Sequence, residues 1–119
     1  MEIAKGFGSA TLGKNESGDP MITGRIDGIK YGIYFFDCTS NKDCRSIQFS
    51  AGWSTTDKPS WDKINEWNRD KRFGKAFLDT DGDPRIEMDF PLPEVQTSYL
   101  EIFFSWWQTA LKSFQNHLN

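Results

Sequence analysis

The sequence predicts an α+β domain in which helices pack against an antiparallel β-sheet of about six strands. Apolar residues recur at every second position in several short segments, and turn-forming residues separate these segments, as is typical of antiparallel strands. Around residues 57–72, and again in the last quarter of the chain, the apolar spacing becomes that of a helix. The 119 residues suit a single domain, residues 1–119, with the element order (α)ββββαββα.

Four strands joined by short turns are predicted in the first half of the chain. They cover residues 7–12, 21–26, 29–37 and 45–51. The helix-forming residues 1–5 precede them, and Gly6 and Gly8 end that helix. Asp27-Gly28 predicts a two-residue hairpin between the second and third strands, because both central positions of a type I′ turn need positive φ.

The third of these strands is predicted to lie inside the sheet and to be buried on both faces. Its main apolar face carries Ile29, Tyr31, Ile33 and Phe35. Tyr34 and Phe36 place aromatic rings on the opposite face. Apolar side chains on both faces are typical of a central, covered strand.

The second half of the chain is predicted to contain a helix, two strands and a long C-terminal helix. The first helix starts at residues 57–60, with Pro59 tolerated in its first turn, and ends near Arg72. Its apolar face consists of Trp61, Ile64, Trp67 and Asn68. The two strands and the last helix follow at residues 73–79, at residues 85–90, and from Glu94 or Thr97 onward.

Two asparagines in the first of these helices, Asn65 and Asn68, predict a structural use of a side-chain amide. Asparagine is a weak helix former, so two of them beside Trp61 and Trp67 call for a reason. We expect Asn68 or Asn65 to bond the backbone at the helix end or at the edge of an adjacent strand. The alternative is that these residues line a polar and aromatic ligand pocket.

Charge and motif content exclude several function classes. The net charge of −3 argues against nucleic-acid binding, which calls for a basic surface. No apolar run reaches the ~20 residues that cross a membrane. The single histidine, His117, lies near the C-terminus, where residues are usually mobile. Nucleotide-binding, hydrolase and zinc-protease motifs are absent from the sequence. We therefore predict no enzyme, no catalytic residue, no cofactor and no metal.

The two cysteines, Cys38 and Cys44, flank a polar segment that is typical of an exposed loop. Without a nearby histidine or a second cysteine pair, their spacing suits zinc poorly. We expect a disulfide between them, which implies an oxidising compartment. Two reduced thiols beside a hairpin in the cytoplasm are the alternative.

Three aspartates in one predicted turn resemble the start of a calcium-binding loop. They are Asp79, Asp81 and Asp83. Pro84 and Phe90 stand where that loop needs a glycine and a bidentate glutamate. We therefore expect a polar hairpin turn here.

Glu87 and Asp89 form a second acidic pair, on one face of a predicted strand and about 6.5–7 Å apart. Such a spacing suits glycoside hydrolysis when the pair faces a cleft. We expect instead the solvated face of an amphipathic strand. A carboxylate-dependent hydrolase is the last-ranked function.

The last helix carries more apolar surface than one face of a sheet covers. Its large apolar residues are Tyr99, Leu100, Ile102, Phe103, Phe104, Trp106, Trp107, Leu111 and Phe114. They span over half of the helix circumference, whereas a helix packed on one side typically buries a stripe of ~100° or somewhat more. Either the helix is wedged deeply into its own fold, or a preceding helix, a second subunit or a bound partner covers the excess.

Aromatic side chains anchor many protein interfaces, and this helix is rich in them. The predicted partner-binding residues are Phe103, Phe104, Trp106 and Trp107.

Six segments of the chain resemble the YbjN domain family, which is described as a bacterial sensory transduction regulator. They are Gly18-Asp19-Pro20, Tyr31-x-x-Tyr34-Phe35-Phe36-x-Cys38, Cys44-x-Ser46-Ile47-Gln48-Phe49-x-Ala51-Gly52, Ile64-Asn65-x-Trp67-Asn68, Arg72-Phe73-Gly74-Lys75-Ala76 and Glu87-Met88-Asp89. The resemblance extends from about Ala4 to Phe114. It implies a fold similar to type III secretion chaperones, which are often dimeric and bind other polypeptides, and it implies no catalytic residues.

The resemblance also bears on the N-terminus and on location. The family usually has a helix before its first strand, so residues 1–5 are expected to be the remainder of a truncated N-terminal helix. Relatives with the paired cysteines often carry a signal peptide, which favours the periplasm or secretion. The chain shows no signal peptide itself, so a cytoplasmic location stays open.

We therefore predict a non-enzymatic protein-binding or regulatory module of the YbjN type. It is expected to associate with a polypeptide partner, or with itself as a homodimer, through apolar surface on the last helix and the sheet beneath it. Neither nucleic-acid binding nor membrane insertion is expected. The alternative is a small-ligand-binding sensory domain with a pocket lined by Trp61, Trp67 and sheet aromatics.

Overall fold

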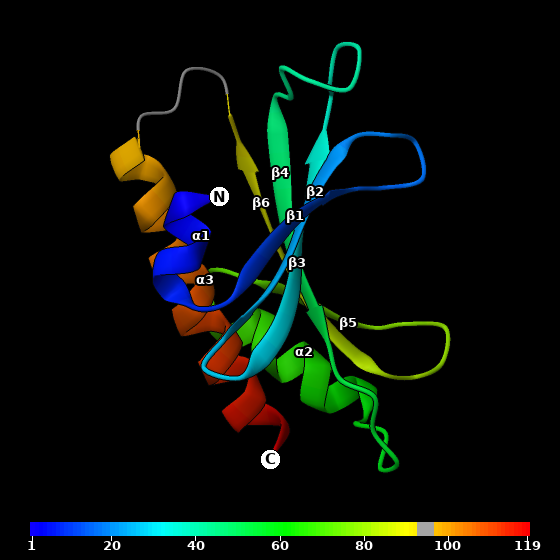
Figure 1. Ribbon diagram of the computed structural model, residues 1–119. Coiled ribbons are helices and arrows are strands. Elements are labelled where there is room, and N and C mark those ends of the chain that lie inside the picture. The colour runs from blue at the N-terminus through cyan, green and yellow to red at the C-terminus, as the bar shows by residue number, and fades with distance from the viewer. Residues whose placement is uncertain (93–96) are drawn as a thin grey trace.

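The computed structural model describes residues 1–92 and 97–119, and it has the predicted α+β architecture (Figure 1). The described residues form three helices and six strands in the order αββββαββα. The helices are α1 (Glu2–Phe7), α2 (Trp61–Asp70) and α3 (Thr97–Leu118). The strands are β1 (Ala10–Lys14), β2 (Pro20–Ile26), β3 (Ile29–Phe36), β4 (Ser46–Gly52), β5 (Lys75–Leu78) and β6 (Pro84–Pro91). The predicted helix start at Glu94 lies outside the described residues.

The six strands form one antiparallel sheet in the order β1-β2-β3-β4-β6-β5. The first four strands pair in sequence order, which confirms the predicted meander. The hairpin between β2 and β3 is also confirmed, because Ile26 pairs with Ile29 across Asp27 and Gly28. Both turn residues have positive φ, 52° and 80°. Strands β1 and β5 are left as the two edges of the sheet.

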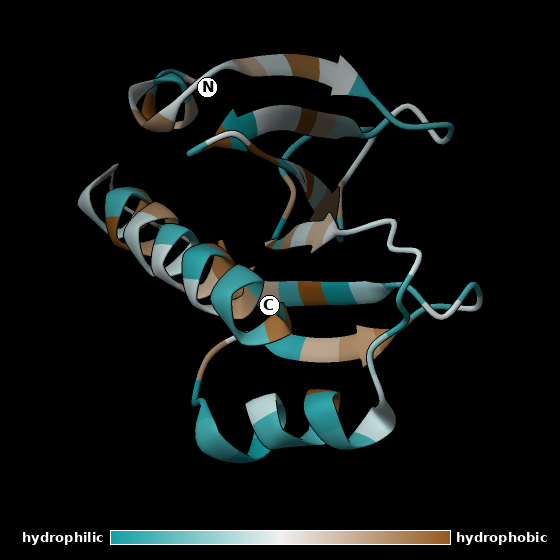
Figure 2. Cartoon of the chain, turned by 90° about the horizontal axis from the view of Figure 1, so that it is seen from below, coloured by the Kyte–Doolittle hydropathy of each residue, from teal (hydrophilic) through white to brown (hydrophobic). Residues whose placement is uncertain are grey.

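Helices α1 and α3 cover the same face of the twisted sheet, and α2 lies beside the edge strand β5 (Figures 1 and 2). The side chains that alternate toward this face form the core with the inner side of α3. At its centre, the ring of Phe49 on β4 lies 5.0 Å from that of Phe104 and 5.5 Å from that of Trp107. The long C-terminal helix is therefore wedged against the sheet by its aromatic residues.

The first helix runs further than its composition predicts. It passes through Gly6 and ends only at Gly8, so the predicted strand start at residue 7 is wrong, and β1 begins at Ala10. The ring of Phe7 stacks on Phe104 at 5.4 Å. Glycine in a helix is less favourable than alanine by about 1 kcal/mol. The packing of α1 on α3 outweighs this cost at Gly6. The excess apolar surface of α3 is thus covered in part by α1.

Two predicted burial patterns are wrong. Phe36 is exposed and Tyr34 is only half-buried, because none of the three helices in the described part of the chain covers the outer face of β3. Trp61 is also exposed, although it was assigned to the apolar face of α2. Ser60 is the N-cap of this helix and accepts a hydrogen bond from the backbone N–H of Lys63 at 3.2 Å. Trp61 is therefore the first helical residue, one turn before the buried Ile64 that packs against the core.

Candidate functional site

The four predicted partner-binding residues lie on two different sides of α3. Phe104 and Trp107 face the core, with 6% and 0% of their surface exposed. Phe103 is half-buried, and its ring stacks on Phe90 of β6 at 4.1 Å. Trp106 is 44% exposed and faces away from the sheet centre. The structure thus leaves Trp106 as the member of this set with a large accessible apolar surface.

The accessible apolar side of α3 is a strip that includes one residue from outside the helix. We call it the α3 strip, and it consists of Tyr99, Ile102 and Trp106 of α3 together with Phe73, all of them exposed. The ring centroids of Phe73 and Trp106 are 4.7 Å apart. The spacing of the three helical residues places them on one side of α3, and Phe73 extends this surface toward α2.

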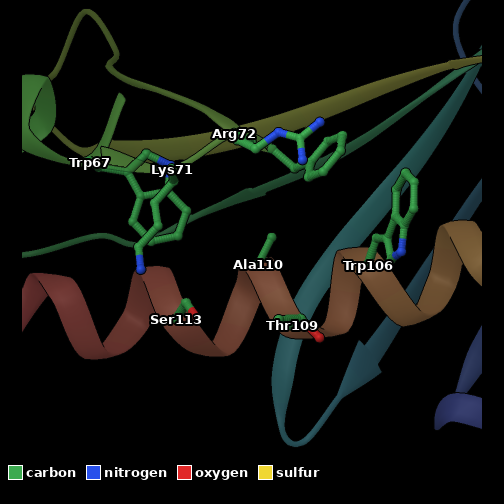
Figure 3. A pocket seen from close by; sticks show the side chains of 8 residues that line it. Trp67, Lys71, Arg72, Trp106, Thr109, Ala110 and Ser113 are labelled. Atoms are coloured by element: carbon green, nitrogen blue, oxygen red, sulfur yellow. The ribbon is translucent and has the colours of Figure 1, made fainter. Parts of the chain in front are cut away.

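A small cleft continues the α3 strip beyond Trp106 (Figure 3). On one wall, α3 carries the small residues Thr109, Ala110 and Ser113 after Trp106. The opposite wall is formed by Trp67, Lys71, Arg72 and Phe73, at the end of α2 and in the turn that follows. The cleft has a volume of about 260 Å³ and is mostly apolar. The change from large to small side chains along α3 is what makes it hollow.

The wall on the α2 side is held in place by hydrogen bonds to the backbone. The indole Nε1 of Trp67 donates to the carbonyl oxygen of Gly74 at 2.9 Å. The backbone N–H of Lys71 donates to the carbonyl oxygen of Trp67, also at 2.9 Å, and ends the helix. Asn68 fixes the next part of the chain, because its side chain bonds both backbone groups of Ala76. The turn that carries Phe73 is therefore anchored at both ends.

The electrostatic character of the cleft is positive. Lys71 Nζ lies over the ring of Trp67, 5.7 Å from its centroid, and Arg72 Cζ lies 5.2 Å from the centroid of Phe73. No acidic residue lines the cleft, and neither cation forms an ion pair within the described residues. The nearby carboxylate of Asp70 is bound twice by Arg69, whose guanidinium lowers the pKa of Asp70. Two cations thus remain available at the rim of an apolar hollow.

The other predicted candidates occupy structural positions. The carboxylates of Asp79, Asp81 and Asp83 lie within 4.8 Å of one another in the turn between β5 and β6. Asp79 Oδ1 accepts from the backbone N–H of Asp81 and of Asp83, at 2.9 and 3.0 Å, and Asp83 pairs with Lys58. This is the polar hairpin turn that the sequence predicts.

The second acidic pair lies on the uncovered face of the sheet. Gln48 Nε2 donates to Glu87 Oε1 at 3.3 Å and to Asp89 Oδ1 at 3.0 Å, so one amide bridges both carboxylates. Lys75 lies 3.6 Å from the same oxygen of Glu87. The pair is therefore part of a polar surface network between neighbouring strands.

Three further residues singled out in the sequence, the two cysteines and the histidine, also occupy structural positions. Cys38 and Cys44 form a disulfide that closes the loop between β3 and β4. His117 lies near the end of α3, and its Nε2 is 2.7 Å from the carbonyl oxygen of Lys63 in α2. This contact links the two helices, which is a structural role.

Sequence reasoning missed Lys71, Arg72 and Phe73 as parts of the site. The prediction extended the helix to residue 72 and assigned residue 73 to a strand, so neither pattern indicated an exposed turn facing α3. A tertiary contact, Phe73 against Trp106, brings them to the site, and local periodicity carries no signal for it. The adjacency of two cations and an aromatic residue was the available clue.

A protein-family model matches residues 2–119 of the chain. The matched family is YbjN, described as "Putative bacterial sensory transduction regulator". The comparisons with curated proteins and with solved structures found no match. The similarity to type III secretion chaperones therefore stays a prediction from the family resemblance. Within the described residues, no helix combines the length and the apolar character needed to span a membrane.

Proposed function

The chain belongs to the YbjN family, and from this premise we propose that it is a non-enzymatic regulatory module that binds another polypeptide through the α3 strip. The observation that carries this proposal is the exposed pair of Phe73 and Trp106, two large rings in contact with each other and open to solvent. Exposed aromatic clusters are uncommon on monomeric surfaces, and tryptophan dominates binding energy in many interfaces. A regulator that conveys a signal needs such a contact surface.

The position of the strip also supports binding rather than a purely structural use. The core side of α3 is already filled by buried rings such as Phe104 and Trp107. Helix α1 covers a neighbouring side of α3, where Phe7 stacks on Phe104. The apolar surface left at Trp106 is thus in excess of what the domain itself packs.

Mutation of the strip tests this proposal, with a tryptophan elsewhere as the control. Cells that produce tagged wild-type protein, Trp106→Ala, Phe73→Ala or Trp61→Ala are crosslinked, and the recovered polypeptides are identified by mass spectrometry. Trp61 is 70% exposed at the start of α2 and outside the strip, so its removal controls for the loss of any surface indole. Near-UV circular dichroism confirms that each variant is folded.

The expected result is a reproducible polypeptide, or a second copy of this chain, that is lost with Trp106→Ala and Phe73→Ala and retained with Trp61→Ala. Sedimentation velocity distinguishes self-association from binding of a different protein. Recovery of the same polypeptides with all four proteins would refute the α3 strip as the contact surface.

The disulfide supports placing this function in an oxidising compartment, the periplasm or the cell exterior. Cys38–Cys44 is a bond that persists in such compartments and is rare in the reducing cytoplasm. Alkylation of the protein inside intact cells, followed by mass spectrometry, tests this placement. Full alkylation of both thiols without a reductant would place the protein in the cytoplasm instead.

The alternative of a small-ligand sensory domain has less support. Trp67 does line the cleft, but Trp61, its predicted partner in an aromatic pocket, lies outside it. The cleft volume of about 260 Å³ is also below the ~300–1,000 Å³ that is usual for small-molecule pockets.

A further inference from the structure

We propose that the cleft beside Trp106 receives a single apolar side chain from an acidic segment of the partner polypeptide. The inference rests on the proposed function, since it names the chemistry of the partner that the α3 strip binds. Three properties of the cleft support it: its size, its charge and its continuity with the strip.

The size and the lining suit one large side chain. The lining is formed mainly by Trp67, Phe73, Trp106 and Ala110, which come from the two facing walls (Figure 3). An aliphatic or aromatic side chain that enters the cleft loses part of its contact with water, and this burial of apolar surface favours binding. Thr109 and Ser113 add two short polar side chains to the α3 wall.

The positive charge at the rim of the cleft favours acidic residues next to the inserted side chain in the partner polypeptide. Lys71 and Arg72 flank the same wall, and each is held over an aromatic ring of the cleft. The chain as a whole carries a net charge of −3, whereas Lys71 and Arg72 form no ion pair among the described residues. One carboxylate next to the inserted residue gains a charge-assisted hydrogen bond from Arg72. If a second carboxylate follows, it gains a similar bond from Lys71. A basic segment meets repulsion at the same place.

The continuity with the α3 strip favours a polypeptide over a small molecule. From Tyr99 to Ser113 the helix rises about 21 Å, at ~1.5 Å per residue. That length matches roughly six residues of an extended chain. A segment lying along α3 thus places one side chain in the cleft and others on Trp106 and Ile102.

Fluorescence anisotropy with labelled peptides tests this inference on the full chain. The probes are fluorescein-labelled Asp-Glu-X-Asp-Glu peptides in which X is Leu, Ile, Met, Phe or Tyr. Comparison peptides replace X by Ser, or replace all four acidic residues by Lys. We expect the best acidic peptide to bind at least tenfold more tightly than its Ser and Lys counterparts, and more weakly as the salt concentration rises. The indole N–H signals of Trp67 and Trp106 are expected to shift in two-dimensional ¹H–¹⁵N spectra.

Charge-reversed variants assign the effect to the rim. Lys71→Glu and Arg72→Glu are each expected to weaken the acidic peptide at least tenfold. Lys30→Glu is the matched control, because Lys30 is an exposed lysine on β3, outside the cleft, and the substitution changes the net charge by the same amount. It is expected to change binding less than twofold.

Several results would overturn the inference. Equal binding of the Lys peptide refutes the selection by charge, and equal binding of the Ser peptide refutes side-chain insertion. Tighter binding of phenylacetate than of any peptide assigns the cleft to small carboxylates. If no peptide binds while Trp106→Ala still loses the crosslinked partner, the acidic-segment inference fails and the proposed function stands. If the crosslinked partner is also unaffected by Trp106→Ala, both fail.

Discussion

The side chain of Asn68 forms two hydrogen bonds with the backbone of Ala76, in the manner of a neighbouring strand. Its Nδ2 donates to the carbonyl oxygen of Ala76, and its Oδ1 accepts from the N–H of Ala76, both at 2.9 Å. Ala76 belongs to β5, the strand at one edge of the sheet. Helix α2 therefore closes this edge through one amide, which also fixes the chain just after the cleft.

Removal of this amide is expected to destabilise the domain. Asn68→Ala loses both hydrogen bonds in a partly buried setting, so the free energy of unfolding should fall by about 1–2 kcal/mol. Urea unfolding followed by tryptophan fluorescence measures the change. Asn65→Ala is the matched control: Asn65 is exposed on the same helix, and alanine there should leave stability unchanged or raise it slightly. Equal destabilisation by both variants would contradict this role of Asn68.

The Asn68 interaction shows what the sequence predicts well. Two weak helix formers near two tryptophans predict that Asn68 or Asn65 bonds the backbone, at the helix end or at the edge of an adjacent strand. In the structure the residue is Asn68 and the partner is the edge strand. The strands, the Asp27-Gly28 hairpin and the element order are predicted on the same grounds, because alternation and turn chemistry are local properties. The structure confirms the hairpin and the element order, whereas the first strand begins at Ala10 rather than at residue 7.

The candidate site is predicted less completely because it depends on which side of α3 faces the sheet. Apolar residues span over half of the circumference of that helix, so its pattern alone does not distinguish the buried Trp107 from the exposed Trp106. Phe49 on β4 and Phe7 on α1 pack against Phe104, and these contacts determine which side of α3 faces the sheet. These contacts join residues that are distant in the sequence, and single-sequence periodicity does not encode them.

Substitutions along α3 should separate core from surface. Phe104→Ala is expected to lower the free energy of unfolding by about 3–5 kcal/mol, because it empties a space between the rings of Phe49 and Phe7. Trp107→Ala is expected to do the same. Trp106→Ala should cost about 1 kcal/mol or less, since its side chain is half exposed in the folded state. Chemical denaturation of the three variants gives the comparison.

A large loss of stability in Trp106→Ala, similar to that of Phe104→Ala, would mean that Trp106 belongs to the core. The distinction matters for experiments on binding. A loss of partner in Phe104→Ala or Trp107→Ala reports unfolding, whereas a loss in a folded Trp106→Ala protein reports the α3 strip.

The hydroxyl of Tyr31 is predicted to contribute nothing to stability. Tyr31 is buried, its hydroxyl has no hydrogen-bond partner within the described residues, and burial raises its pKa. Tyr31→Phe keeps the ring contacts with Phe104 and Trp107, each at 6.5 Å, and removes the unpaired polar group. Thermal and urea unfolding should show equal stability or a gain of up to about 1 kcal/mol. A loss above 1 kcal/mol would reveal a buried water bound to the hydroxyl.

The disulfide is expected to stabilise the domain by restricting its unfolded chain. It closes a short loop in which Ser40, Asn41 and Asp43 all have positive φ. The double variant Cys38→Ser/Cys44→Ser should lose about 2 kcal/mol of unfolding free energy. Wild-type protein unfolded with a reducing agent should match the double variant, and the double variant should not respond to that agent. Equal stability of the oxidised wild type and the double variant would refute this contribution.

The carboxylate of Asp83 is expected to contribute to the loss of stability of the domain at acid pH. Lys58 donates to Asp83 Oδ1, the backbone N–H of Thr55 donates to the same oxygen at 3.1 Å, and these bonds lower the pKa of Asp83, that of Lys58 most strongly. Because the folded pKa is below the unfolded pKa, the folded state binds fewer protons in between, and the stabilisation is lost as the pH falls through the folded pKa. The loss should therefore appear below about pH 4.

Asp83→Asn is expected to flatten the fall of the thermal midpoint between pH 5 and pH 2 that the wild type shows. Asp81→Asn is the control, because it removes one charge from the same turn and leaves both bonds to Asp83 in place. Its thermal midpoint should vary with pH as that of the wild type does. Equal flattening in both variants would attribute the effect to net charge rather than to the Lys58–Asp83 pair.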